Sequence, residues 1–269
     1  MTEPLSPDRL RKLDAFILEL SAEAAAITLP AFRADTPVDN KAADAFDPVT
    51  EADRGAEAAI RRLITQRFPD HGVIGEEYGA DRPDAEHVWV IDPIDGTRAF
   101  IAGLPLWTTL IALRFQGSPV LGVIGQPYLR EFYVGSPALG SRLVTPDGER
   151  RLEVRVCDGL PEAVIATTDP DLFTPPELDA WTAVRGAARL ARLGCDAYAF
   201  AMVALGTMDL VVESGLKSWD VEAAVPLIEG AGGLLTDWSG QRLGREGGRV
   251  AAAGDPRVLR DALPMLRRT

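Results

Sequence analysis

The sequence has few of the residues that build disulfide frameworks, zinc sites and catalytic triads. Its 269 residues include two cysteines, Cys157 and Cys195, and two histidines, His71 and His87. Two cysteines outside any Cys-x-x-Cys spacing indicate free thiols in a reducing compartment rather than a disulfide scaffold or a redox motif. Two histidines leave little for a histidine-rich zinc site or a Ser-His-Asp triad. We expect both histidines to lie in turns or at the surface.

Positive charge is also scarce, since 28 Lys and Arg face 40 Asp and Glu and the net charge is −12. Without a basic stripe, nucleic acid and anionic membrane surfaces are not expected partners. No run approaches the roughly 18 apolar residues of a membrane span, and the first residues lack the features of a signal peptide, so we expect a cytoplasmic protein. A small phosphorylated substrate is not excluded, because a bound metal reverses the local sign of charge.

Apolar residues make up 46% of the chain and charged residues 25%, which is typical of a globular protein. The pattern predicts a first helix over residues 7–29, a second from about Thr50 and a series of short strands up to residue 134. A turn-rich stretch at 136–160 divides an N-terminal α+β half (1–150) from a C-terminal α/β half (151–269) of one compact unit. In the second half the pattern predicts strands over 163–167, 187–193 and 209–213, and helices over 196–206 and 220–231. A final helix is predicted over 256–263, with Pro264 just past its end. The alternation of strands and helices indicates a layered α/β arrangement.

The most informative stretch is Asp92–Thr97, which reads Asp-Pro-Ile-Asp-Gly-Thr and follows a predicted buried strand. Pro93 is expected to end that strand, Gly96 lets the backbone approach a ligand, and a helix beginning near Thr97 would direct free N–H groups at an anion. Two carboxylates with a main-chain carbonyl between them can share two hard cations. The alternative is an Asx-turn followed by a capped helix.

Three further acidic residues stand at ends of predicted elements, namely Glu76 after a short strand, Asp53 in the first turn of the second helix, and Asp220 at the start of another helix. Each has a simpler interpretation: a solvated turn for Glu76, a capping box with Thr50 for Asp53, and a favourable helix-dipole position for Asp220. Four acidic clusters at four element ends nevertheless favour an oxygen-rich site for divalent metal.

Three segments in this order resemble the inositol monophosphatase superfamily: GEE (75–77), WVIDPIDGT (89–97) and WDVEAAVPLIEGAGG (219–233). Members are lithium-sensitive, magnesium-dependent phosphomonoesterases. The resemblance spans nearly the whole chain. It implies a layered αβαβα sandwich, usually dimeric, with two or three Mg²⁺ per site and a small phosphorylated substrate.

The resemblance also implies a metal-binding set in which the main-chain carbonyl of one residue joins four carboxylates, with Glu76 counted among the catalytic residues as well. The set is Glu76, Asp92, Ile94 (through its carbonyl), Asp95 and Asp220.

Five further residues match family positions. Gly96 and Thr97 would bind the phosphate, and Thr97 with Asp53 would orient and activate the attacking water. Asp47 would be a buried supporting acid, and Lys41 would approach the metal-bound water.

The pattern Gly194-Cys-Asp-Ala-Tyr198 is similar to the histidinol-phosphatase branch of the superfamily, whereas Trp219-Asp220 is the general-family form. Histidinol phosphate carries a cationic amine, which an acid beside the phosphate site would pair with. We expect Asp196 and Glu213 to bind the substrate on the leaving-group side. The alternative for Asp196 is an acid at a helix start.

Three hypotheses about function follow. The first is histidinol-phosphate phosphatase, an enzyme of histidine biosynthesis. The second is another phosphatase of the superfamily, acting on inositol phosphate or a 3′-phosphonucleotide. The third is a non-catalytic metal-binding scaffold that uses the same acidic cluster.

Overall fold

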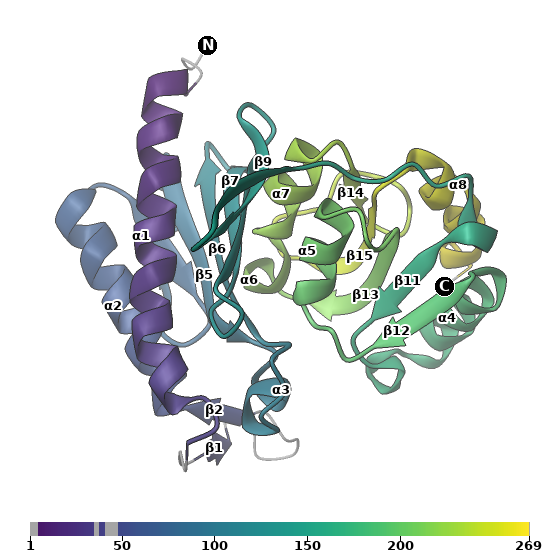
Figure 1. The fold of residues 1–269 in the computed structure, drawn as a ribbon, viewed down its shortest axis with the longest axis horizontal. Helices are drawn as coiled ribbons and strands as arrows, with labels where there is room; N and C mark the ends of the chain where they lie inside the picture. The colour runs from purple at the N-terminus through teal and green to yellow at the C-terminus, as the bar shows by residue number, and fades with distance from the viewer. Residues whose placement is uncertain (1–4, 35–37, 41–47, 269) are drawn as a thin grey trace.

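The computed structural model describes residues 5–34, 38–40 and 48–268, so the predicted site residues Lys41 and Asp47 lie outside the described residues. Five layers stack side by side in Figure 1: a helix pair, a sheet, a layer of helices, a second sheet, and an outer helix pair. This is the αβαβα sandwich that the resemblance implies, and the fold prediction is confirmed.

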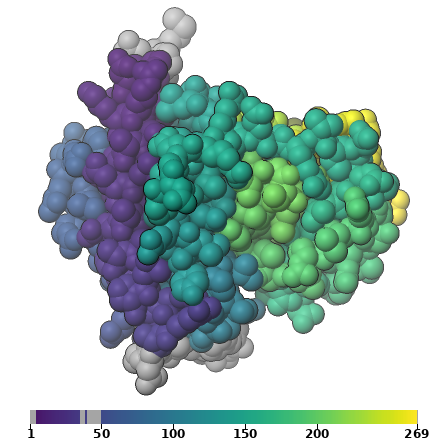
Figure 2. Space-filling view, in the orientation of Figure 1, coloured from purple at the N-terminus to yellow at the C-terminus, as the bar shows by residue number. Residues whose placement is uncertain are grey.

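The first helix layer consists of α1 (Pro7–Ala31) and α2 (Glu51–Arg67), which pack against each other and on the outer face of the first sheet. Ser6 caps α1, because its hydroxyl accepts a hydrogen bond from the N–H of Arg9, and Pro7 occupies the first helical position. Figure 2 shows α1 running as a ridge along the surface of the molecule. The predicted helix over 7–29 is therefore confirmed.

The first sheet has eight strands in the order β10-β9-β8-β7-β6-β5-β3-β4, and only the β3–β5 pair is parallel. The strands are β3 (Gly72–Gly75), β4 (Gly79–Asp81), β5 (His87–Asp95), β6 (Thr108–Phe115), β7 (Ser118–Gln126), β8 (Glu131–Ser136), β9 (Gly140–Thr145) and β10 (Gly148–Leu152). The last two form a hairpin in the segment predicted to be turn-rich, because its turn residues mark the tips of strands rather than a loop.

The second sheet has five strands in the order β12-β11-β13-β15-β14, with β11 parallel to both of its neighbours. They are β11 (Val164–Thr167), β12 (Leu190–Leu193), β13 (Leu210–Leu216), β14 (Leu234–Thr236) and β15 (Gly248–Ala253). The sequence-based assignment missed β14 and β15. These strands consist mostly of small or apolar residues, and such a short apolar run does not distinguish a buried strand from a buried helix segment.

Between the sheets lie α5 (Tyr198–Ala204), α6 (Ser218–Val221) and α7 (Ala224–Gly230), and outside the second sheet lie α4 (Pro175–Ala187) and α8 (Pro256–Leu266). The short elements are β1 (Val38–Asn40), β2 (Pro48–Thr50), α3 (Thr97–Ile101), η1 (Leu160–Glu162) and η2 (Pro170–Leu172).

The helix predicted over 220–231 is two helices, α6 and α7. Pro226 has no N–H to offer the carbonyl of Glu222, and its ring crowds that carbonyl, so the first helix ends there. In α8, by contrast, Pro264 is accommodated inside the helix, which the sequence had placed past its end. The buried face of α8 continues to Leu266.

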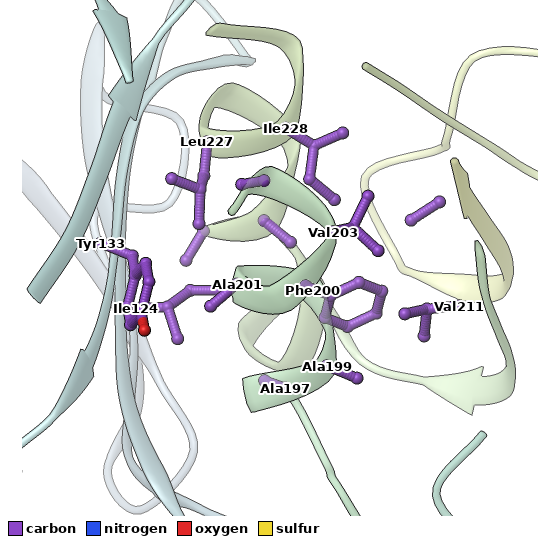
Figure 3. Packing of buried hydrophobic residues seen from close by; sticks show 14 of the residues in the cluster. Ile124, Tyr133, Ala197, Ala199, Phe200, Ala201, Val203, Val211, Leu227 and Ile228 are labelled. Carbon is purple, nitrogen blue, oxygen red and sulfur yellow. The ribbon is translucent and has the colours of Figure 1, made fainter. Parts of the chain in front are cut away.

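Strand residues alternate between the layers of the core. Val90 of β5 faces the middle helices, while its neighbours Trp89 and Ile91 face α1 and α2. Figure 3 shows α5 between the two sheets, with Phe200 directed toward Val211 of β13. The central strands of both sheets are therefore buried on both faces, and the helices between the sheets bring the two halves into contact.

The two histidines are buried, contrary to expectation. His71 and His87 expose 5% and 3% of their surface, and their rings stack 4.6 Å apart. Phe68 stacks on the other face of His71, and the indole N–H of Trp89 donates a hydrogen bond of 3.1 Å to Nδ1 of His71. The aromatic neighbours cover a residue type that usually favours the surface.

No helix in the described part of the chain is long and apolar enough to cross a membrane.

Candidate active site

A cavity of about 210 Å³ lies where the ends of β3 and β5 meet α3, the start of α5, and α6. Nine of the residues singled out in the sequence line it, and they come from both halves of the chain. They are Glu76, Asp92, Ile94, Asp95, Gly96, Thr97, Asp196, Glu213 and Asp220.

A β-bulge directs both aspartates of the central motif into this cavity. Asp92 pairs with Leu110 and Asp95 with Thr108, so three steps along β5 oppose two along β6. In a regular strand, residues three apart face opposite sides of the sheet, and the extra residue of the bulge reverses the alternation. Pro93, which was expected to end the strand, lies within this bulge, where its missing N–H is tolerated.

Glu76 reaches the same cavity because β3 runs parallel to β5. Parallel strands bring their carboxyl ends to one edge, and the N–H of Glu76 bonds to the carbonyl of Ile91 at 3.2 Å. The turn after β3 is held by Glu57 of α2, whose side chain is fully buried and accepts hydrogen bonds from the N–H groups of Glu77 (2.7 Å) and Tyr78 (3.2 Å). The sequence reasoning missed Glu57, because nothing local links a helix residue to a turn twenty positions on.

Asp220 and the start of α5 bring the second half to the cavity. The N–H of Lys217 donates a 2.6 Å bond to the Asp220 carboxylate, which fixes the side chain at the beginning of α6. The N–H of Ala197 donates to Asp95 at 2.8 Å, so the two halves meet directly at a candidate metal ligand.

Gly96 and Thr97 connect β5 to α3. Gly96 has φ +78°, and a Cβ there would also approach the carboxylate of Asp196 to 3.1 Å, so both the backbone and the space favour glycine. Thr97 is the first residue of α3, as predicted, and its hydroxyl donates to the carbonyl of Ile94 at 3.1 Å.

Asp53 is buried but does not line the cavity. Its carboxylate accepts hydrogen bonds from both the N–H and the hydroxyl of Thr50, so the capping box is formed. Its charge still reaches the site, because it contributes to raising the pKa of Asp92. The pairing of Asp53 with Thr97 on a water molecule stays a prediction.

The cavity concentrates negative charge away from water. Burial first, then the charge of Glu76, raises the pKa of Asp92 well above its usual value. Burial and the charge of Asp196 do the same for Asp95. Such shifts mark charge that the protein leaves uncompensated, and they cluster at functional sites.

The donor set fits a hard divalent cation. The four predicted carboxylates and the carbonyl of Ile94 all line the cavity, and they offer only oxygen, the donor that Mg²⁺ prefers. In the described part of the chain, no three acidic, histidine or cysteine side chains are placed closely enough to hold a metal ion as they stand. Carboxylates that repel one another around a cavity are what a cation would draw together and neutralise.

The part of the cavity wall that comes from the second half of the chain carries Asp196 and Glu213. Asp196 adopts φ +45°, and burial raises its pKa to about 6 although Arg98 acts in the opposite direction. Burial raises the pKa of Glu213 to about 7, against hydrogen bonds from Thr168 and Thr167.

Thr168 and Ser214 also line this wall and were missed by the sequence reasoning. Both adjoin predicted strands, and the parallel pair β11–β13 brings those ends together. Because the carboxyl ends of parallel strands meet at one edge of a sheet, polar residues just after the predicted strands were a sequence signal for both residues.

Comparison with known proteins agrees with this geometry. The chain matches the model of the inositol monophosphatase family over residues 9–267. It is 43% identical over 233 residues to the chloroplastic bifunctional phosphatase IMPL2 of Arabidopsis thaliana, covering 83% of this chain but 66%, just under two thirds, of the plant protein. It is 37% identical over 226 residues to a histidinol-phosphatase of Chlorobaculum parvum, covering 84% of this chain and 85% of that one.

Among solved structures, an inositol monophosphatase from Zymomonas mobilis superimposes with a TM-score of 0.86 at 42% identity, covering 96% of this chain and 98% of that chain. The resemblance drawn from the three sequence segments is confirmed.

Proposed function

Because the chain belongs to the inositol monophosphatase family, we propose that this phosphatase hydrolyses histidinol phosphate to histidinol and phosphate, with Mg²⁺ as its cofactor. The main observation in favour of this substrate is a second group of acids in the cavity wall. Asp196 lies beside Gly96, and Glu213 lines the same cavity. A cationic amine would compensate these carboxylates, and a neutral polyol would not. The relative from Chlorobaculum parvum that is named a histidinol-phosphatase supports the same substrate.

Glu76, Asp92, Asp95, Asp220 and the carbonyl of Ile94 would hold two or three Mg²⁺. Bound Mg²⁺ would neutralise phosphoryl oxygens and lower the pKa of a coordinated water. That water would be the nucleophile, so the reaction would need no covalent nucleophile from the protein.

The chain's own groups would do the positioning. The N–H groups of Gly96 and Thr97 would bind phosphate at the start of α3. The hydroxyl of Thr97, together with Asp53 and Glu76, would orient the attacking water. Asp47 as a supporting acid and Lys41 near that water complete the proposed set.

The alternative substrate is inositol phosphate, and one observation favours it. Glu213 has a pKa near 7 and receives three hydrogen bonds from Thr167 and Thr168, so it is suited to neutral hydroxyls as well as to a cation. The similar structure from Zymomonas mobilis is titled an inositol monophosphatase. A 3′-phosphonucleotide is a further alternative. The complete set of acids around the cavity argues against a non-catalytic scaffold.

The homodimer, the cytoplasmic location, the place in histidine biosynthesis and the division into halves at residue 150 stay predictions of the sequence.

A phosphate-release panel tests the proposal. The enzyme is assayed with histidinol phosphate, inositol 1-phosphate, a 3′-phosphonucleotide and glycerol 2-phosphate, each with Mg²⁺ and with EDTA. We expect Mg²⁺-dependent release and the highest kcat/KM for histidinol phosphate. A higher kcat/KM for inositol phosphate would transfer the assignment to the alternative, and no release from any ester would favour the scaffold.

A further inference from the structure

One buried ion pair joins the first sheet to the short helix that carries Asp220. Arg114 of β6 and Glu222 at the end of α6 expose 8% and 5% of their side chains. Nε of Arg114 donates to Oε2 of Glu222 at 2.6 Å, and Nη2 donates to Oε1, so the contact is bidentate. Nη2 also donates to the carbonyl of Arg245 at 3.2 Å, which ties in the segment before β15.

Of the two elements joined by this pair, α6 lines the cavity through Asp220, and β6 pairs with β5, which lines it. Arg114 lies on β6, which pairs along its length with β5, the strand of Asp92 and Asp95. Glu222 is two residues after Asp220 and closes α6 through a 3.0 Å bond from its N–H to the carbonyl of Ser218. The pair therefore links the helix of one candidate ligand to the sheet that carries two others.

The helix α6 cannot hold its own position. It has four residues, less than the length at which helical hydrogen bonding sustains itself, and Glu222 and Ala223 separate it from α7. Its packing on β5 and β6 and the Arg114–Glu222 contact must supply the restraint.

Stability is a poor explanation for such a pair. Desolvation of two charges offsets most of their attraction, and apolar residues of similar volume are often as stabilising. What an arginine fork adds is orientation, because its planar donors match a carboxylate in one geometry.

We propose that Arg114 is a positioning residue that, through Glu222, holds Asp220 at the distance from Asp92 and Asp95 needed to share cations. The inference rests on the proposed function only in taking Asp220 as a metal ligand. It assigns a role to two residues that touch neither substrate nor metal.

The test measures Mg²⁺ affinity by isothermal titration calorimetry, in parallel with the Mg²⁺-induced shift in Tm. Replacing both charges together, in R114M/E222M, avoids leaving one charge buried alone. We expect the Kd for Mg²⁺ to rise on the order of 10-fold, the scale for residues that orient metal ligands. Arg114→Lys keeps the charge but loses the bidentate guanidinium contact, and its Kd for Mg²⁺ is expected to lie between those of the double variant and the wild type.

The matched control is R142M/D14M. Arg142 and Asp14 also form a bidentate pair, at 2.9 and 2.7 Å, but it joins β9 to α1 away from the cavity. The control is expected to shift Tm without changing the Mg²⁺ affinity.

A Kd in R114M/E222M within twofold of the wild-type value would overturn the inference, and if that variant does not fold, the same limit applied to Arg114→Lys decides. Asp220→Asn separates this outcome from a failure of the metal site: if it too leaves the Kd unchanged, the assignment of Asp220 as a ligand is wrong.

Discussion

The acidic cavity and the histidine stack both bury ionisable side chains, but they differ in the type of group and in what surrounds it. The acidic cavity gathers carboxylates that raise one another's pKa around open space. The histidine stack packs two imidazoles against Phe68, with Trp89 donating to His71, and lowers the pKa of both. Burial favours the neutral form in both regions, but in the cavity several carboxylates face a space in which a cation could compensate their charge.

The comparison teaches that burial alone does not mark a functional site. What distinguishes the cavity is that several groups of one charge face a shared space. The stack instead has aromatic packing and a hydrogen-bond donor that suits a neutral ring. Substitutions can therefore separate catalysis from stability.

The largest expected effect comes from Asp92. Asp92→Asn removes a charge that the proposed metal site requires, and we expect Mg²⁺-dependent turnover to fall on the order of 10³-fold. The same change relieves like-charge repulsion, so Tm without Mg²⁺ is expected not to fall. Steady-state kinetics at saturating Mg²⁺ and a thermal melt in EDTA measure both quantities, and near-normal turnover would refute the proposed role.

A smaller effect is expected at Thr97. In Thr97→Ala the hydroxyl that bonds to the carbonyl of Ile94 is lost, and kcat should fall about 10²-fold, at the low end for lost acid–base assistance. Because the N–H groups proposed to bind phosphate remain, KM should change less than kcat. If KM alone rises, Thr97 serves binding rather than the activation of water.

Asp196 tests whether the second group of acids selects a cation. Asp196→Asn is expected to lower kcat/KM for histidinol phosphate roughly 30-fold. This corresponds to a loss of about 2 kcal/mol of transition-state stabilisation, at the lower end for truncating a buried charge pair. Glycerol 2-phosphate, which has no amine, serves as the internal control and should lose little. Equal losses on both esters would show that Asp196 has a structural role.

The histidine stack should affect stability and not catalysis. Burial, followed by the nearby charges of His87 and Arg9, lowers the pKa of His71 from 6.5 to about 4. Between these values the unfolded chain binds a proton that the folded chain does not. The free energy of unfolding should therefore decrease as pH falls from 6.5 toward 4, by at most about 1.4 kcal/mol per pH unit from this residue.

His71→Phe checks the sign of this effect. The cavity carboxylates titrate in the opposite sense, since their pKa values are raised, so the informative quantity is the difference between variant and wild type in urea unfolding at several pH values. That difference should move in favour of the variant as pH falls, while turnover stays within about twofold. A pH-independent difference would mean that His71 does not titrate as its burial implies.

The sequence predicted α1 closely and placed the start of α3 at Thr97, because caps and helical periodicity are local signals. The prediction that Pro93 ends the strand was wrong, because the structure places this proline in a bulge within β5. The sequence also failed at the histidines, because stacking partners come from different elements and no spacing reveals them.

By itself, the sequence determined the fold family and the chemistry of the site: a contiguous Asp-x-x-Asp-Gly-Thr motif, acids at further element ends, and few alternative ligands. These features depend on short-range geometry and on residue type. Tertiary structure alone decided that Asp92 and Asp95 face the same way, that Glu57 holds the turn of Glu76, and that Arg114 fixes the helix of Asp220. Such contacts form because a buried polar group must find a partner, and the partner that folding supplies is often far along the chain.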